Sequence, residues 1–494
     1  MPSPTFLART FNELGITTLL NSPRDVHILL STRFIRMFAY GSSTLILALF
    51  FSALGHSDTA IGLFMTLTLV GDVLISLLLT LVADRLGRRR ILLLGALLMV
   101  LSGMVFSMVS NYWVLLLAAV VGVISPSGNE IGPFRAVEES TLAHLTEAKT
   151  RSDIFALYVV AGTLGASGGT LVAGWMTQSV QSSGWSDIAS FRLVFWLYAI
   201  IGFVKAGMTL LLSNKCEPQP EDHRPSEVEM RRTEGQQQQQ QQNEQHQPFL
   251  EDEDDNDEES TSKPPPPPPK KTSWFQLSEK SKYTLLKLCG IFFFDSLASG
   301  MVPVSLIAYY ISNKFDVAEG TLGTIMASAQ FISSIGNIFA SSVAKRIGLV
   351  RTMVFTHLPS AIFLLLLPAP SSLFMTIVLL IARSVLNSMD QAPRSAFLSA
   401  VVLPEERTAV MGIVNTVKTS SQSSGPLITG ALAASKRFWI AFVIAGSLKA
   451  SYDVMMLSMF RNTPLEGDRG NRSQRFQEPE GAEDDDQDGG RQRS

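Results

Sequence analysis

The chain has 494 residues, of which 46% are hydrophobic and 17% are charged, and its net charge at pH 7 is -3. Three polar segments, 1–26, 213–281 and 461–494, hold about half of the charges, so the other 365 residues carry only 40 of the 83 Asp, Glu, Lys and Arg. That is too few for a water-facing surface. The composition therefore excludes an ordinary soluble enzyme, and the small net charge gives no basic field for a nucleic acid.

Hydrophobic runs long enough to cross a bilayer, about 20 residues each, recur along these 365 residues. The predicted spans are 28–51, 60–83, 91–109, 114–145, 153–177, 191–212, 283–312, 318–343, 350–367, 372–402, 408–433 and 438–460. The sequence thus predicts an all-α integral membrane protein with twelve transmembrane helices. The first span contains Arg33 and Arg36 and is too long for a cleaved signal peptide.

Lys and Arg in the short loops predict the orientation of the chain. With the N-terminus inside, the cytoplasmic loops carry ten Lys and Arg and the outer loops carry four. Because cytoplasmic loops are enriched in positive charge, we expect both termini in the cytoplasm. We favour the plasma membrane, with a vacuolar or other internal membrane as the alternative.

The two halves of the hydrophobic region resemble each other. Asp84-Arg-Leu-Gly-Arg matches Lys345-Arg-Ile-Gly-Leu and Gly62 matches Gly323 at an offset of 261, Glu130 and Pro133 match Asp390 and Pro393 at 260, and Arg151, Gly169 and Gly174 match Arg407, Gly425 and Gly430 at 256. The near-constant offset predicts a parallel duplication, with an N-terminal six-helix bundle over 27–212 and a C-terminal one over 282–460. Such duplications are typical of alternating access around a central site.

The polar segments are predicted to be cytoplasmic. Residues 213–281 contain seven consecutive Gln, an acidic run and six consecutive Pro, and together with the tail 461–494 they lack the apolar residues needed for a core. We therefore expect disorder in both. The linker 213–281 is a candidate binding segment for cytoplasmic proteins, although a stiff tether is the simpler interpretation. Such polar tracts are typical of a eukaryotic, and in particular a fungal, protein.

The loop between the second and third spans carries a recognisable motif. Val82-Ala-Asp84-Arg85-Leu-Gly87-Arg88-Arg89-Arg90 resembles the signature loop of the major facilitator superfamily, and the twelve spans and six-plus-six repeat fit this resemblance over residues 28–460. The resemblance implies a gating loop formed by Asp84, Arg85, Gly87 and Arg88, in which Asp84 contacts the start of span eleven in the outward-facing state. Gly87 permits a tight reversal.

Charges at membrane depth are the most informative feature, because each is costly in lipid and is a functional candidate. They concentrate in spans one, four, seven and ten, which the resemblance implies line the central cavity. The candidate substrate and proton pathway residues are Arg36, Glu130, Arg135, Glu138, Asp295, Asp390 and Arg394. A carboxylate with a cationic partner that can leave it is able to bind and release a proton.

Repeat and helical spacing predict partners for some of these charges. Arg36 and Asp295 occupy equivalent positions in the two halves, and we hypothesise that they pair across the cavity in one conformation. Residues three or four apart share a helix face. Asp390 and Arg394 are four apart and Arg135 and Glu138 are three apart, so each pair is expected on one face. Lys449 and Asp453, four apart in the last span, are expected to pair with each other.

Together these features predict a secondary active transporter, not an enzyme. We expect a monomer in the lipid bilayer that moves a small molecule, coupled to protons, with no cofactor, metal site or nucleic-acid partner. A glycine-rich stretch in span five, Gly162 to Gly174, resembles the motif of drug-proton antiporters and slightly favours export of a drug-like or metabolic compound. The alternatives are proton-coupled import of a polar or anionic nutrient and a non-transporting nutrient sensor that signals through 213–281.

Overall fold

A computed structural model of the chain describes residues 16–122, 124, 126, 133–147, 150–217, 279–402 and 406–460. Within the helices, the side chains at 16, 76–86, 133, 152, 279–280, 337–342, 344–345, 392, 395–396, 399–400 and 407–409 lie outside the description. All regular elements assigned within these ranges are helices, and both halves belong to one compact unit.

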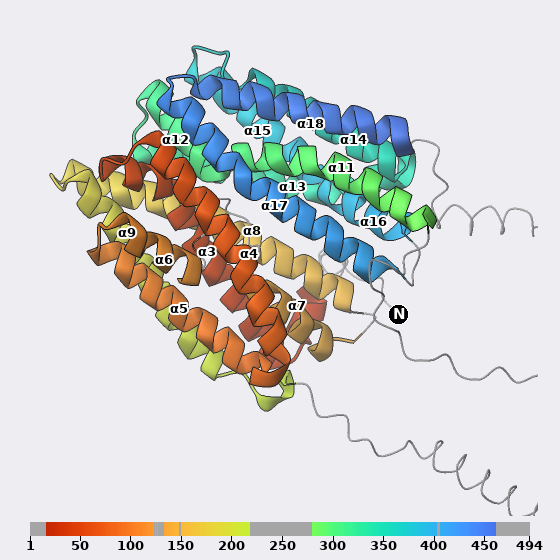
Figure 1. The fold of residues 1–494 in the computed structure, drawn as a ribbon. Coiled ribbons are helices and arrows are strands. Elements are labelled where there is room, and N and C mark those ends of the chain that lie inside the picture. The colour runs from red at the N-terminus through yellow and green to blue at the C-terminus, as the bar shows by residue number, and fades with distance from the viewer. Residues whose placement is uncertain are drawn as a thin grey trace, which may run out of the picture. The chain divides into compact units, whose positions relative to one another are not determined.

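The N-terminal half supplies the first six spans (Figure 1). Its helices are α3 (Arg24–Ala53), α4 (Asp58–Leu86), α5 (Arg88–Met108), α6 (Tyr112–Gly122), α7 (Pro133–Leu145), α8 (Arg151–Ser182) and α9 (Asp187–Leu210), with a short α2 (Ile16–Leu20) before them and a 3-10 turn η1 (Asn214–Cys216) after them. The C-terminal half supplies the other six. Its helices are α11 (Glu279–Met301), α12 (Val304–Phe315), α13 (Glu319–Ile347), α14 (Leu349–Leu366), α15 (Leu373–Met389), α16 (Gln391–Val401), α17 (Arg407–Ala434) and α18 (Phe438–Phe460).

Each of the twelve predicted spans contains a helix, and spans four, seven and ten contain two each. Eight of the described helices are long and apolar enough to cross a membrane by length and composition. Proline accounts for the breaks, because it lacks an N–H and is favoured at the start of a helix. Pro133 begins α7, Pro303 directly precedes α12, and Pro393 lies in the first turn of α16.

The duplication is visible in the backbone of the two motif turns. Gly87, between α4 and α5, has a φ of 86°, and Gly348, its repeat partner between α13 and α14, has a φ of 87°. Only glycine adopts this region without strain. The reversal predicted at Gly87 is therefore confirmed, and it occurs in both halves.

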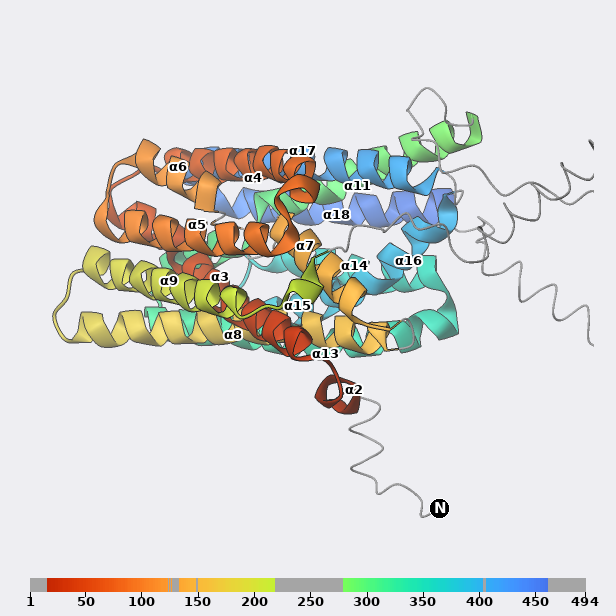
Figure 2. The same cartoon turned by 90° about the horizontal axis from the view of Figure 1, so that it is seen from below.

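The helix unit has two distinct ends. The terminal end holds the start of α3, the turn at Gly87 and the end of α18, and the sealed end holds the connection between α3 and α4 at residues 53–58. Close to the sealed end, α4 packs on α17 and α8 packs on α13, as Figure 2 shows for both pairs.

Glycines from the sequence repeat form both contacts between the halves. A Cβ placed on Gly62 of α4 would lie 2.9 Å from the Cα of Gly430 in α17 and would collide with the Pro426 carbonyl. A Cβ placed on Gly174 of α8 would likewise lie 2.9 Å from the Cα of Gly323 in α13. Since Gly62 matches Gly323 and Gly174 matches Gly430, the two contacts are equivalent under the duplication.

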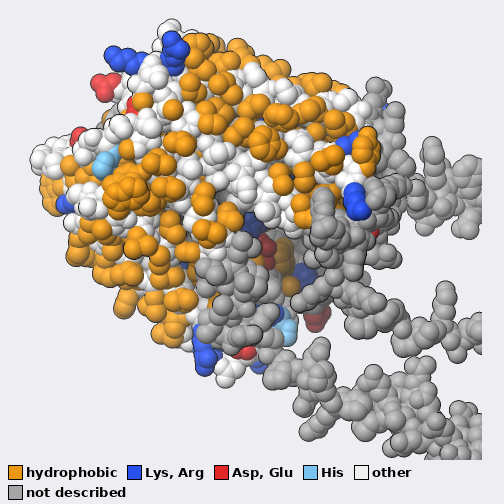
Figure 3. Space-filling model, viewed as in Figure 1, with side chains coloured by type: hydrophobic (Ala, Val, Ile, Leu, Met, Phe, Trp, Pro, Cys, Tyr) orange, Lys and Arg blue, Asp and Glu red, His pale blue; other side chains and the backbone are white. Residues whose placement is uncertain are grey.

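Hydrogen bonds reinforce the sealed end. The Tyr309 hydroxyl of α12 donates to Asp58 Oδ1 at the start of α4 over 2.8 Å. At the equivalent position of the C-terminal half, Glu319 Oε1 accepts from Gln181 Nε2 of α8 over 3.2 Å. Nearby, Ser305 Oγ of α12 lies 2.8 Å from the carbonyl oxygen of Thr44 in α3. Figure 3, in contrast, shows a recess toward the terminal end in which charged side chains are visible.

Candidate functional site

A cluster of buried polar groups lies inside the N-terminal half around Glu138 of α7. Arg36 Nη2 of α3 is 2.5 Å from Glu138 Oε2, and Lys205 Nζ of α9 is 3.7 Å from Glu138 Oε1. The Tyr158 hydroxyl of α8 donates to Glu138 Oε2 over 2.8 Å. The exposed fractions of the three charged side chains are 2% or less. One carboxylate thus joins four helices, and we call these four residues the Glu138 cluster.

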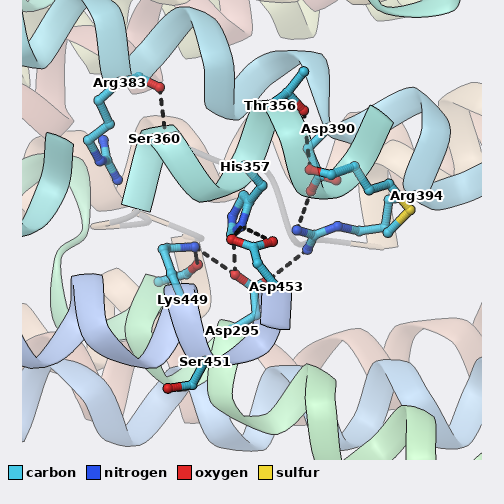
Figure 4. A network of polar contacts seen from close by, with 12 residues as sticks. Asp295, Thr356, His357, Ser360, Arg383, Asp390, Arg394, Lys449, Ser451 and Asp453 are labelled. Atoms are coloured by element: carbon cyan, nitrogen blue, oxygen red, sulfur yellow. Dashed lines mark hydrogen bonds and ion pairs between the residues drawn. The ribbon is translucent and has the colours of Figure 1, made fainter. Parts of the chain in front are cut away.

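The C-terminal half holds a larger cluster around Asp295 of α11 (Figure 4). Arg394 Nη1 of α16 is 2.6 Å from Asp295 Oδ2, and Lys449 Nζ of α18 is 2.7 Å from Asp295 Oδ1. Lys449 also donates to Ser299 Oγ, and Arg394 forms a second ion pair with Asp390. The two oxygens of Asp295 are therefore occupied by cations from two different helices.

Histidine links this centre to a second carboxylate. His357 of α14 places Nδ1 3.0 Å from both oxygens of Asp453 in α18, and its Nε2 is 3.5 Å from Asp295 Oδ1. Both side chains are buried, with exposed fractions of 1% for His357 and 0% for Asp453. We call Asp295, His357, Asp390, Arg394, Lys449 and Asp453 the Asp295 cluster.

Aromatic rings flank buried arginines in both halves. In the C-terminal half the Arg394 guanidinium lies 5.3 Å from the Tyr452 ring centroid and 5.6 Å from that of Phe292. In the N-terminal half Arg33 lies 4.6 Å from the ring centroid of Tyr158. Such faces attract a cation where water is excluded, so they favour the charged side chains at these depths.

The two clusters are built alike but with the charges exchanged. In the N-terminal half span one supplies the arginine, Arg36, and span four supplies the carboxylate, Glu138. In the C-terminal half span seven supplies the carboxylate, Asp295, and span ten supplies the arginine, Arg394. A lysine from the last span of each half completes both arrangements.

Five of the seven predicted pathway residues lie in these clusters. Arg36 and Glu138 belong to the Glu138 cluster, and Asp295, Asp390 and Arg394 belong to the Asp295 cluster. Asp390 and Arg394, which were expected to share a helix face, form an ion pair. Glu130 lies outside the described residues, and so do the side chains of Asp84 and Arg85. Gly87 and Arg88 are described at the turn between α4 and α5.

Arg135, Arg36 and Asp295 each have a partner within their own half. Arg135 pairs with Glu139, 2.6 Å away, and not with Glu138, and its side chain is 43% exposed. Arg36 and Asp295 each bind a partner within their own half, so the conformation described here is not one in which they pair across the cavity.

The predicted pair of Lys449 with Asp453 is wrong. Lys449 binds Asp295 and Asp453 binds His357, although the two residues are four apart in α18. A bond to a neighbouring helix replaces the local one, because the facing helices bring more complementary partners into reach.

Sequence reasoning missed Tyr158 and His357 and gave Lys205 and Lys449 little weight. One signal could have found the lysines: Val204-Lys205-Ala206 and Leu448-Lys449-Ala450 occupy the last span of each half in similar sequence contexts. No comparable pattern marks Tyr158 or His357, which are single residues in helices α8 and α14.

The chemistry of both clusters is that of a buried carboxylate held by removable cations. A proton that binds such a carboxylate cancels its charge and weakens its hold on the arginine. A freed guanidinium can then bind a carboxylate, phosphate or hydroxyl of another molecule. The arrangement is suited to exchange protons against a polar group within the membrane.

Comparison with known proteins agrees with this architecture. The family model for the Major Facilitator Superfamily matches residues 29–283 and 288–481. The chain is 36% identical over 440 residues to "Uncharacterized membrane protein YJR124C" of Saccharomyces cerevisiae, an alignment that covers 88% of this chain and 94% of the yeast protein.

Solved structures share the fold at low sequence identity. The inward open conformation of the xylose transporter XylE from E. coli has a TM-score of 0.64 at 12% identity and covers 89% of this chain and 97% of its own. The nucleoside transporter NupG has a TM-score of 0.61 at 14% identity, covering 89% and 100%. The inward-facing bacterial homolog of the human lysosomal transporter Spinster has a TM-score of 0.59 at 13% identity, covering 88% and 94%. The helix arrangement, the repeat and the family match together place this chain in the major facilitator superfamily.

Proposed function

We propose that the protein is a proton-coupled secondary transporter that moves a small polar solute by alternating access. The observation that supports this most directly is Asp295, whose two oxygens are held by Arg394 and Lys449 from different helices. Protonation of Asp295 removes one of the two carboxylate charges that hold Arg394, the other being that of Asp390. The guanidinium nitrogen released from Asp295 is then available to the solute, so binding of proton and solute are linked.

The sealed end is proposed to face away from the cytoplasm. The Lys and Arg bias of the loops supports a cytoplasmic terminal end, and the conformation described here would then be inward-facing. Two of the similar solved structures carry the same description, inward open and inward-facing.

The charges support a polar solute as the substrate class. Charged side chains near the recess favour a solute with polar groups, and the similar structures include a D-xylose-proton symporter and a nucleoside transporter. The expectation of drug export was based on glycines of α8. In the structure Gly165 and Gly169 lie against backbone carbonyls of α3, and Gly174 lies against α13. These glycines serve helix packing, so we favour a polar solute over a drug-like one.

Proton flux in liposomes tests the proposal. The purified chain, reconstituted with an internal pH dye, would be screened against sugars, nucleosides, amino acids, organic acids and amphiphilic cations. We expect one class to drive proton movement that is lost in Asp295→Asn and retained in Glu139→Gln, a matched control that neutralises a carboxylate outside both clusters. Solute flux without proton movement would refute the coupling.

A further inference from the structure

Asp72 is a buried carboxylate that neither cluster uses. It lies in the middle of α4, its exposed fraction is 4%, and neither of its oxygens has a hydrogen-bond partner. Glu138 in the same half is surrounded by Arg36, Lys205 and Tyr158. Two carboxylates that are both buried therefore have opposite surroundings, and among the described residues only Glu138 has cations to balance its charge.

The face of α4 that carries Asp72 is buried and otherwise nearly apolar. Met65, Thr68 and Leu69 lie one or two turns away on the same side, with exposed fractions of 3% or less. The Thr68 hydroxyl donates to the Phe64 carbonyl of its own helix over 2.8 Å. On the neighbouring helix α3, Tyr40 lies within electrostatic range of Asp72.

The charged and titratable groups on the helices packed against α4 have other contacts. These helices are α3, α5, α6, α7 and α17. In α3, Arg36 binds Glu138 and Arg33 lies over the Tyr158 ring, and in α7, Arg135 binds Glu139. Tyr112 of α6 donates to the Ala60 carbonyl near the sealed end, and Lys418 of α17 lies over the Phe292 ring. The arginines of α5 lie at the terminal end; they are Arg88, Arg89 and Arg90. Asp72 thus has no ion-pair partner among the described residues.

A proton is the ligand that fits this environment. An ionised carboxylate in an apolar interior without a partner is strongly disfavoured and is relieved by binding a proton. A metal cation would instead need several oxygen ligands, and the described residues contain no group of three or more His, Cys, Asp or Glu that could hold one.

We propose that Asp72 is a second proton-binding site, in the N-terminal half and separate from Asp295. The proton is bound to a carboxylate oxygen in the conformation described here. It is exchanged with solvent when α4 and α17 separate at the sealed end, where Gly62 and Gly430 now hold them together. Proton binding stands on the structure of this site alone, whereas its use in transport rests on the proposed function.

Infrared spectroscopy tests proton binding without requiring transport. The full chain in lipid at neutral pH should show the carbonyl stretch of a protonated carboxyl group, and Asp72→Asn should lose part of that band. Glu139→Gln, which alters a partly exposed carboxylate, should keep it. Because asparagine resembles a protonated aspartate in size and charge, Asp72→Asn should unfold at the wild-type temperature or above.

A full band in Asp72→Asn would overturn the proposal, as would loss of the wild-type band on adding sodium or potassium chloride. Transport adds a second readout: the ratio of protons to solute, from reversal potentials in liposomes, should fall by one in Asp72→Asn while solute flux continues. An unchanged ratio with the band present would overturn proton exchange at Asp72. Absence of any solute-driven proton flux in the wild type, with the band present, would overturn the proposed function and leave the proton site in place.

Discussion

Replacing Gly62 by alanine should open the sealed end. The new Cβ would lie 2.9 Å from the Cα of Gly430, whereas ordinary contacts begin at 3.4 Å. Both obstacles, the Gly430 backbone and the Pro426 carbonyl, are main-chain atoms that cannot rotate away. Helices α4 and α17 would have to separate by about half an ångström or more, because packed interiors leave no free volume.

The size of the effect follows from the cost of overpacking. An extra methyl group in a close-packed contact costs about 1–3 kcal/mol. Only the conformation in which the sealed end is closed bears this cost, so the ratio of open to closed molecules should rise by about 5- to 150-fold. Gly174→Ala, which affects the equivalent contact with Gly323, should act in the same direction.

Distance measurements between spin labels would report the shift. Exposed residues Thr59 and Ser435, at the sealed ends of α4 and α17, accept labels after Cys216 and Cys289 are replaced by serine. The control is Gly207→Ala in α9, where an added Cβ has no atom within 4 Å. It gives the same gain in helix propensity, up to about 1 kcal/mol, without the collision. Identical distance distributions in Gly62→Ala and Gly207→Ala would refute this account of the seal.

The remaining predictions concern the clusters, the seal and the linker. Arg36→Ala should lower the free energy of unfolding by about 3–5 kcal/mol in detergent, because Glu138 loses its closest cation in a buried site. The double variant Arg36→Met with Glu138→Met should be less destabilising. An equal loss of unfolding free energy in the two variants would argue against a buried pair. Tyr309→Phe removes the 2.8 Å hydrogen bond to Asp58. It should shift the equilibrium between closed and open conformations toward opening by about 1.5–3 kcal/mol, measured from the distances between the spin labels. Unchanged label distances would show that the bond is dispensable. Deletion of 220–270 should preserve solute flux in liposomes, whereas loss of flux would favour a signalling role for the linker.

The number of spans and their repeat could be predicted because hydrophobic length and glycine spacing are local properties of the sequence. The partners of buried charges could not, because depth and helix face do not specify which neighbouring helix supplies the opposite charge. Asp390 and Arg394 met the local expectation and pair. Lys449 and Asp453 have the same spacing, yet each binds a residue on another helix. Helical spacing therefore permits a contact but does not select it over a better one.

The location of the ion pairs within each half has a consequence for movement. Arg36 with Glu138 and Arg394 with Asp295 connect helices of the same bundle, whereas the sealed contact between bundles consists of glycine backbone and hydrogen bonds such as that of Tyr309. Breaking a buried ion pair costs several kcal/mol, a barrier that a reorienting bundle does not meet if its pairs travel with it. The Arg36–Glu138 pair can thus move intact with its bundle, while the contact between the bundles, made of glycine backbone and hydrogen bonds, is the part that separates and closes again.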